Sequence, residues 1–309
     1  MDISLLLGKS TRREALKGLG VGILGAAALG MGKSQAQLPI DADETTAPFP
    51  SITYFPKSDL DIVDFALNLE YLEANFYAYA TTGMGIEAQG VEVTGRGTQG
   101  TVTVPSSTMV TFSNPDTQQY AAEIMADEIA HVKFLRGLCL ASGKTPIAQP
   151  EINLVRSFAA LGTDAGLGGE FSPFTNSAND LNFLLGAYIF EDVGVTAYHG
   201  ALASIGNGNV RRYAAGIMGT EAYHASNIRT QLYDLGSNAR SDSQAIANVV
   251  NSVGGAGIAQ GVVMGNESNI VPSNSNAVVY TRTAAQVLNI VYISGNGTPG
   301  GFFPKGINA

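Results

Sequence analysis

The chain has 309 residues, with 26 acidic and 17 basic side chains, a formal net charge of −9 and a sequence pI of about 4.8. This acidic balance argues against a nucleic-acid binder, which needs a basic face to meet phosphates. Charged residues make up only 14% and apolar residues 45%, which excludes a disordered acidic chain. Cys139 is the single cysteine, so an intrachain disulfide and a cysteine-rich metal site are both excluded.

Residues 1–36 are typical of an export signal rather than of a folded element. Residues 11–17, Thr-Arg-Arg-Glu-Ala-Leu-Lys, resemble the twin-arginine motif, and a Gly/Ala-rich apolar run follows from Gly18 to Gly32. Ser34 and Ala36 are small residues at the −3 and −1 positions of a cleavage site. The run is too short and too rich in glycine for a membrane anchor.

We therefore expect the twin-arginine export machinery as a partner, and a mature protein in the periplasm, the cell envelope or outside the cell. Removal of residues 1–36 leaves 12 basic and 24 acidic side chains, a net charge of −12. Because no other stretch reaches about 18 apolar residues, we expect no membrane contact in the mature form. A homodimer is compatible with these features.

Four helices are predicted after a proline-rich linker at 37–57. Apolar residues recur at helical spacing over about 58–80, 114–143, 177–205 and 209–235. The short link at 206–208 predicts that the last two helices pack antiparallel. The sequence thus predicts a mainly α fold, a four-helix bundle over 58–236.

Two segments depart from the helical pattern. Within 84–113, residues 91–94 and 101–104 alternate in polarity around a glycine-rich stretch, which predicts a β-hairpin insertion. Residues 237–309 are rich in Asn, Ser and Gly, and we expect a loop-rich extension packing on the bundle, with one helix at 283–293. The glycine-rich runs at 162–169 and 254–261 lack the context of a phosphate loop and are expected to be loops.

A Glu-x-x-His pair interrupts the apolar stripe of the second helix, at Glu128 and His131, and of the fourth helix, at Glu221 and His224. Residues three apart share a helix face, so each carboxylate and imidazole point into the bundle together. A buried carboxylate costs several kcal/mol, roughly, unless a partner neutralises it. The two pairs therefore predict cations between them.

The first and third helices carry a second repeated spacing. Glu70 is followed seven residues later by Tyr77, and Glu191 seven residues later by Tyr198. The chain thus reads as two copies of one helix pair, each with Glu-x6-Tyr and then Glu-x-x-His.

This pattern resembles the ferritin-like dimetal carboxylate bundles, in which two helices each give one Glu and two others each give a Glu-x-x-His. The resemblance implies six ligands, with Glu128 and Glu221 bridging two metals and one histidine on each metal. The implied ligands are Glu70, Glu128, His131, Glu191, Glu221 and His224. These donors suit two ions of iron or manganese, and zinc could compete.

The strings 67–77, 190–198 and 300–304 further resemble exported ferritin-like proteins related to plant desiccation-induced proteins. This resemblance implies a dinuclear centre that reacts with oxygen or peroxide in stress protection, as a dimetal oxidase, a peroxidase or a manganese-catalase-like protein. The alternative is a protective envelope protein without enzymatic activity, in which the metal site is structural or vestigial.

Several residues keep alternative interpretations. Glu73 lies close to the face of Glu70 and could replace it as ligand. Tyr77 and Tyr198, the candidate catalytic residues, are either core tyrosines, hydrogen-bond donors to a ligand or electron donors. Asp192 could orient a histidine from outside the site. His199 is expected to be solvated, and Cys139 to be a buried, inert thiol.

Overall fold

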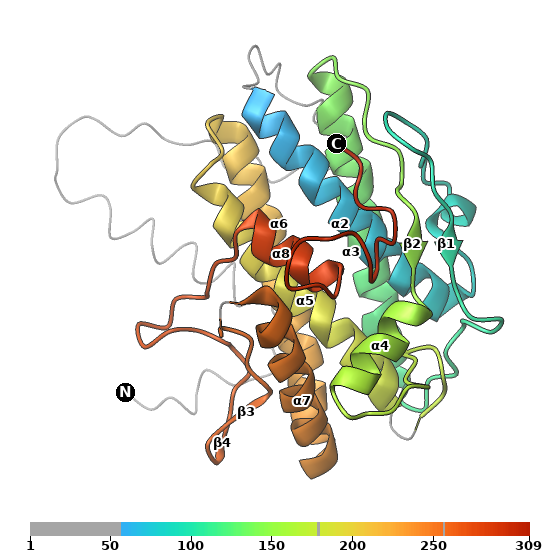
Figure 1. Ribbon diagram of the computed structural model, residues 1–309, viewed down its shortest axis with the longest axis vertical. Helices are drawn as coiled ribbons and strands as arrows, with labels where there is room; N and C mark the ends of the chain where they lie inside the picture. The colour runs from blue at the N-terminus through green and yellow to red at the C-terminus, as the bar shows by residue number, and fades with distance from the viewer. Residues whose placement is uncertain (1–56, 178–179, 256) are drawn as a thin grey trace, which may run out of the picture. The chain divides into compact units, whose positions relative to one another are not determined.

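The computed structural model of the chain describes residues 57–177, 180–255 and 257–309. Four long helices form its centre: α2 (Lys57–Thr82), α3 (Pro115–Ala141), α5 (Leu181–Leu202) and α6 (Gly208–Asp234). They run alongside one another, with α2 packed on α3 and α5 on α6 (Figure 1). This confirms the mainly helical bundle, and the predicted helix ends lie within four residues of the observed ones. The predicted signal, and the linker up to residue 56, lie outside the described residues.

The two helix pairs repeat the same Glu, Tyr and His positions at a fixed distance along the chain. Each position of α2 matches the position 121 residues later in α5, and each position of α3 matches the position 93 residues later in α6. Asn114 and Asn207 cap the starts of α3 and α6. Buried Asp180 accepts a hydrogen bond of 3.0 Å from the backbone N–H of Asn114, and Asp59 accepts one of 2.7 Å from that of Asn207. Each helix pair thus fixes the start of the other pair's second helix, so α2 and α6 begin at the same end of the bundle.

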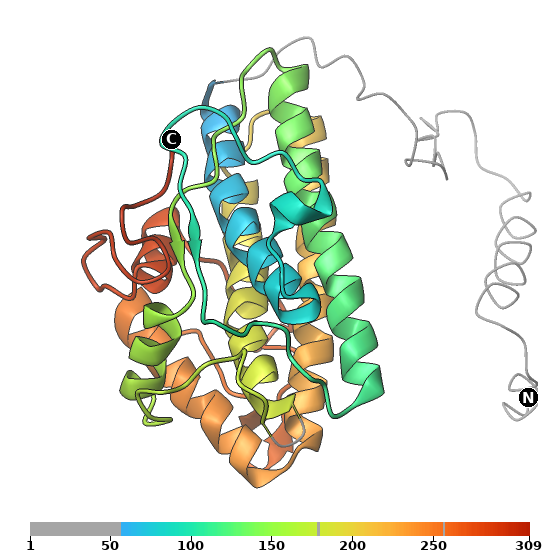
Figure 2. The ribbon, with the colours of Figure 1, turned by 90° about the vertical axis from the view of Figure 1, so that its right-hand side faces the viewer.

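The predicted hairpin at 84–113 is wrong. Its extended residues pair with residues 145–154 rather than with each other: β1 (Val102–Thr103) lies parallel to β2 (Ile152–Asn153), and Arg96 bridges to Ile147 (Figure 2). The glycines that suggested a turn are positions of close backbone approach. A Cβ on Gly95 would lie 2.2 Å from the carbonyl oxygen of Pro146. A short 3-10 helix, Ile86–Gln89, precedes this extended segment.

Three further helices cover the bundle: α4 (Arg156–Asp164), α7 (Ser237–Gly254) and α8 (Ala284–Val291). The helix α8 agrees with the predicted helix at 283–293, whereas α4 and α7 lie where we expected loops. The polar composition of α7 conceals an apolar stripe, Ala239, Ile246 and Val250, that is buried in the structure. Packing of such a stripe stabilises a helix more than its intrinsic propensity does. The small strands β3 (Val263–Met264) and β4 (Glu267–Ser268) pair antiparallel.

Aromatic rings fill the end of the bundle where α3 and α5 begin. Phe76 stacks on Phe183 with ring centroids 5.7 Å apart, and Phe158 contacts Phe76 at 5.8 Å. The C-terminal segment joins this core, because the ring of Phe302 lies 5.1 Å from those of both Phe158 and Phe190. Within the described part of the chain, we find no helix that is long and apolar enough to cross a membrane.

Candidate metal centre

The six side chains singled out in the sequence meet in the middle of the bundle. Glu70 comes from α2 and Glu191 from α5, while α3 and α6 each give one Glu-x-x-His pair. All six are buried: Glu70, Glu128, His131, Glu191, Glu221 and His224. Their convergence follows from helix geometry, because each pair occupies one inward face and the two helix pairs face each other.

His131 faces three of the carboxylates through Nδ1. This nitrogen lies 3.3 Å from Oε2 of Glu70, 3.4 Å from Oε2 of Glu128 and 3.4 Å from Oε1 of Glu221. These four residues each offer a ligand atom, and the atoms all lie within 4.8 Å of one another. Ligand atoms about 2.0–2.2 Å from a shared ion fall within that separation.

His224 forms a second group of the same kind. Its Nδ1 lies 3.1 Å from Oε1 of Glu128 and 3.3 Å from Oε2 of Glu191, and Glu221 completes the group within the same 4.8 Å limit. Glu128 and Glu221 therefore belong to both groups, whereas each histidine belongs to one. The arrangement has the form of two adjacent cation sites that share two carboxylates.

Several polar atoms of this cluster are buried and, despite these short separations, make no hydrogen bond with suitable angles. They are Oε2 of Glu70, Oε1 of Glu128, Oε2 of Glu191, both carboxylate oxygens of Glu221 and Nδ1 of His224. Buried polar atoms in proteins are nearly always paired, and a cluster of exceptions indicates an ion or water that the surrounding residues were shaped to hold. The donor set of carboxylate oxygen and imidazole nitrogen fits iron, manganese or zinc.

The protonation of the cluster reflects crowding of like charges in a dry interior. Burial raises the pKa of Glu70 to about 7, and it raises the pKa of Glu221 well above its usual value, with the charge of Glu128 adding to the effect. Burial also acts on Glu128, but the charges of His131 and His224 prevail and lower its pKa. Without metal, the cluster therefore retains protons that binding of cations would displace.

The two candidate catalytic tyrosines each touch the glutamate of the other helix pair. The hydroxyl of Tyr77 donates a hydrogen bond of 2.5 Å to Oε1 of Glu191, and the hydroxyl of Tyr198 donates to Oε1 of Glu70. Burial, followed by the neighbouring glutamate, raises the pKa of both phenols well above the usual value. Both therefore stay protonated and act as donors, which leaves the second oxygen of each carboxylate facing the cluster.

The outer support of His224 comes from a residue for which the sequence offered no such role. Nε2 of His224 lies 3.1 Å from Oδ2 of Asp127, on α3. Asp192, which we considered for this task, instead accepts a hydrogen bond of 2.6 Å from the buried guanidinium of Arg229. Asp127 directly precedes Glu128, but only the crossing of α3 and α6 shows that it reaches the histidine of the other helix.

Glu73 is a fifth carboxylate beside the cluster, although neither four-residue group includes it. It is buried, and burial together with the charge of Glu221 raises its pKa well above the usual value. The matched position on α5 is Gly194, where an added Cβ would lie 2.4 Å from Oε2 of Glu221 and 3.5 Å from Oε1 of Glu73. The two halves of the bundle therefore differ here, and Gly194 leaves room for the carboxylate of Glu221.

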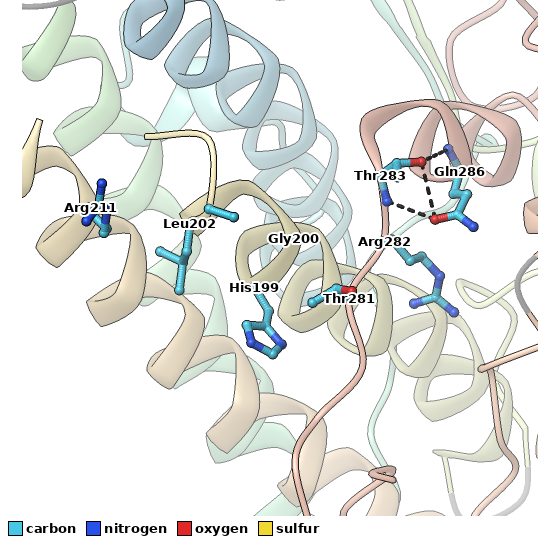
Figure 3. A pocket seen from close by; sticks show the side chains of 9 residues that line it. His199, Gly200, Leu202, Arg211, Thr281, Arg282, Thr283 and Gln286 are labelled. Carbon is cyan, nitrogen blue, oxygen red and sulfur yellow. Dashed lines mark hydrogen bonds between the residues drawn. The ribbon is translucent and has the colours of Figure 1, made fainter. Parts of the chain in front are cut away.

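Two other residues lie away from the cluster. His199 is half-buried rather than solvated and lines a surface pocket of about 570 Å³ (Figure 3). Its Nδ1 lies 3.1 Å from the carbonyl oxygen of Tyr280. Cys139 is buried, and its pKa is raised to about 11 by burial and by the charge of Asp64. A thiol in that state is a poor nucleophile.

In a comparison with known protein families, residues 58–234 match the ferritin-like domain. The chain belongs to the ferritin-like domain family. It is 27% identical over 271 residues to the ferritin-like catalase Nec2 of Nesocodon mauritianus, covering 82% of this chain and 84% of that protein. It is 28% identical over 275 residues to the desiccation-related protein PCC13-62 of Craterostigma plantagineum, covering 81% of this chain and 83% of that protein.

The ferritin-like match spans the four long helices and ends before α7, so all six cluster residues lie within it. The similarity to these two relatives extends over most of the chain and thus takes in residues beyond the bundle. In the structure, residues beyond the bundle belong to the same packed unit, since Phe302 and α8 pack onto α5 and the aromatic core.

Proposed function

We propose that this ferritin-like protein binds two ions of iron or manganese at the buried cluster and reacts with oxygen or hydrogen peroxide in protection against stress. The observation that carries the proposal is the set of unpartnered carboxylate and imidazole atoms that converge from four helices. Such a set is costly to bury without cations. The name of the relative Nec2, a ferritin-like catalase, supports peroxide as a substrate of this chain as well.

In this proposal the residues divide into three roles. Glu128 and Glu221 lie in both groups and would hold both ions, while Glu70 with His131 and Glu191 with His224 would each hold one. Tyr77 and Tyr198 fix the outer oxygens of Glu191 and Glu70 through hydrogen bonds, and Asp127 orients His224. The bound pair of metals would supply two-electron redox chemistry toward oxygen or peroxide.

We also propose that the chain is exported through the twin-arginine route, on the basis of residues 11–17 and the cleavage site at Ala36. That route carries folded proteins, so a centre inside the bundle could be loaded before export. The desiccation-related relative of Craterostigma supports a role in stress protection.

The experiment is a metal inventory followed by turnover. Protein purified without a tag after native export is expected to contain about two iron or manganese ions per chain, as the two overlapping groups imply. It is also expected to consume hydrogen peroxide or oxygen. The double variant Glu128→Ala/Glu221→Ala should lose both metal and turnover, whereas Glu123→Ala, which changes an exposed glutamate of the same helix, should keep both.

Protein that folds and is exported but carries no metal would contradict the proposal and favour a protective role without chemistry. Metal without turnover of oxygen or peroxide would favour a structural centre. Turnover that survives in the double variant would place the chemistry elsewhere.

A further inference from the structure

An apolar cavity of about 420 Å³ lies inside the bundle at the end where α2 and α6 begin. All four long helices line it, together with the start of α8, and most of the lining side chains are aliphatic or aromatic. Three polar residues of the lining, Asp61, Ser204 and Thr283, are exposed and lie at its rim. Arg282 also lines the cavity and is buried, but its guanidinium donates a hydrogen bond to the hydroxyl of Thr196. The interior therefore offers few partners to water.

The inner end of this cavity reaches the candidate metal centre. Leu69 on α2 directly precedes Glu70, and Leu135 on α3 lies one turn beyond His131. Tyr198 on α5 also lines the cavity, and its hydroxyl donates to Glu70. A molecule in the cavity would thus contact the residues that enclose the cluster.

The opposite end of the bundle shows that the cavity is not imposed by the backbone. Ala197 and Ile62 line the cavity. The residues at the matched positions, at the opposite end of the bundle, are the larger Phe76 and Phe183. Phe76 and Phe183 are buried and stacked on each other, and they fill their end. Smaller side chains at the same helix positions open the other end.

The surface pocket with His199 adjoins the cavity, because Gly200, Arg282 and Thr283 line both (Figure 3). The capping box of α8 closes one side: the side chain of Gln286 accepts a hydrogen bond of 2.8 Å from the backbone N–H of Thr283. The apolar cavity therefore continues into a polar pocket at the surface of the bundle.

We propose that this cavity binds an apolar organic molecule with a hydrocarbon body, whose inner end lies against Tyr198. A deep space with a largely apolar lining takes apolar ligands in preference to water, and its open rim gives such a ligand a way in. Its volume is within the range of about 300–1,000 Å³ that small-molecule sites occupy. Oxygen and peroxide are about the size of one or two waters, each of which takes about 30 Å³, so neither accounts for the cavity.

Binding of such a molecule does not depend on the metal, whereas its use as a substrate or reductant rests on the proposed function. The inference therefore deepens that function by naming the chemical class that reaches the centre from this end. It also separates two questions that can be measured independently: whether the cavity binds hydrocarbon, and whether the centre turns over oxygen or peroxide.

The test uses octan-1-ol as probe in calorimetric titrations of the full mature chain, metal-loaded and metal-free. Ala201→Phe and Ala214→Phe fill the cavity from α5 and α6, and Ala122→Phe adds the same ring on the exposed face of α3. Each filling variant should weaken octanol binding at least about tenfold, the loss of about two buried methylene groups. Ala122→Phe should bind like the unchanged protein, and circular dichroism should show all four proteins folded.

Saturable binding that the two filling variants lose, in metal-loaded and metal-free protein alike, is the expected result. The inference is overturned if the unchanged protein shows no saturable binding, or if both filling variants bind as well as Ala122→Phe. A chain that binds octanol but carries no metal would refute the proposed function and leave the cavity site intact. Peroxide turnover without octanol binding would refute the cavity site and leave the proposed function intact.

Discussion

Tyr77 on α2 donates a hydrogen bond of 2.5 Å to Oε1 of Glu191 on α5, although 114 positions separate the two residues. The matched residue Tyr198, on α5, donates the equivalent hydrogen bond to Oε1 of Glu70 on α2. Each half of the bundle therefore positions a carboxylate of the other half. A lone half would lack both the partner carboxylate and the hydroxyl that orients its own.

Removal of one tyrosine hydroxyl should loosen the metal centre without unfolding the chain. Tyr77→Phe keeps the buried ring and its contact with Phe76, but frees the carboxylate of Glu191 to rotate. Loss of such an outer hydrogen bond typically costs about 10–100-fold in metal affinity. Competition with a chelator of known affinity measures this change.

Tyr223→Phe is the matched control, because Tyr223 is 81% exposed and lies beside His224 in sequence but not at the cluster. Equal metal affinity in Tyr77→Phe and Tyr223→Phe would show that the hydroxyl of Tyr77 does not orient a ligand.

Asp127 should support only one of the two metal sites. It faces Nε2 of His224, whereas the matched position on α6 is Thr220, so the support is not duplicated. In Asp127→Asn, an uncharged amide replaces the acceptor of the imidazole N–H. We expect a weakening of about 10–100-fold at the His224 site alone, seen as two unequal steps in a metal titration.

Glu123→Gln removes an exposed carboxylate one turn earlier on α3 and serves as control. Two steps that weaken together in Asp127→Asn would mean that Asp127 acts through general charge rather than through the imidazole.

The sequence predicted the six cluster residues because their placement depends on the repeat of one helix, which residue spacing records directly. It did not predict the contact of Asp127 with His224, because that contact depends on how α3 crosses α6. The glycines at 95 and 100 were ambiguous for a similar reason. A glycine in a turn and a glycine against another backbone look alike until the second segment is known, and here that segment lies about 50 residues further on.

The helix α7 was not predicted because its polar composition conceals the helical spacing of its apolar residues. Residues 237–254 contain many Ser and Asn, which favour caps and turns over helix interiors. The stripe Ala239, Ile246 and Val250 is nevertheless buried in α7. The helix is stabilised by contacts with α8, α5 and α6, and local propensity carries no information about such contacts.

Metal should stabilise the fold more at neutral pH than in acid. In the metal-free protein burial raises the pKa of Glu70 from 4.5 to about 7, so stability present below about pH 4.5 is lost as the pH rises to about 7. The pKa of His224 is raised from 6.5 to about 12, chiefly by Glu191, against the effect of burial. Its contribution to stability is complete below about pH 6.5 and is lost progressively as the pH rises toward about 12. Metal binding needs both groups deprotonated and is favoured over the same range.

Thermal unfolding with and without a chelator tests this expectation. The drop in Tm on chelation should be larger at pH 8 than at pH 5, and Glu128→Ala/Glu221→Ala should show no drop at either pH. A drop that is equal at the two pH values, or larger at pH 5, would contradict the assignment of these groups as ligands.

Export should depend on the paired arginines. The double variant Arg12→Lys/Arg13→Lys keeps the charge of the segment but removes the residues that resemble the twin-arginine motif. We expect it to remain in the cytoplasm as precursor, while Lys33→Arg, outside the motif, is exported normally. Cell fractionation with N-terminal sequencing measures this, and mature protein is expected to begin at Gln37. Export of both variants alike would refute the twin-arginine assignment.

Gly194→Ala should damage the metal centre although alanine favours a helix. In the interior of a helix, glycine is less stable than alanine by roughly 0.5–1 kcal/mol, so the substitution alone predicts a more stable protein. The new Cβ would lie 2.4 Å from Oε2 of Glu221, however, and that carboxylate must move away from the position it shares between the two groups. We expect metal affinity to fall about 10–100-fold, as when the support of a ligand is lost.

Gly216→Ala separates the two effects. Gly216 lies in α6 on the exposed side, and an added Cβ there meets no atom within 4 Å. This variant should raise Tm, in line with the helix preference, and leave metal affinity unchanged. If Gly194→Ala raised Tm by the same amount and kept full metal affinity, Glu221 would not need the space that Gly194 leaves. The difference between Glu73 and Gly194 would then have no bearing on the centre.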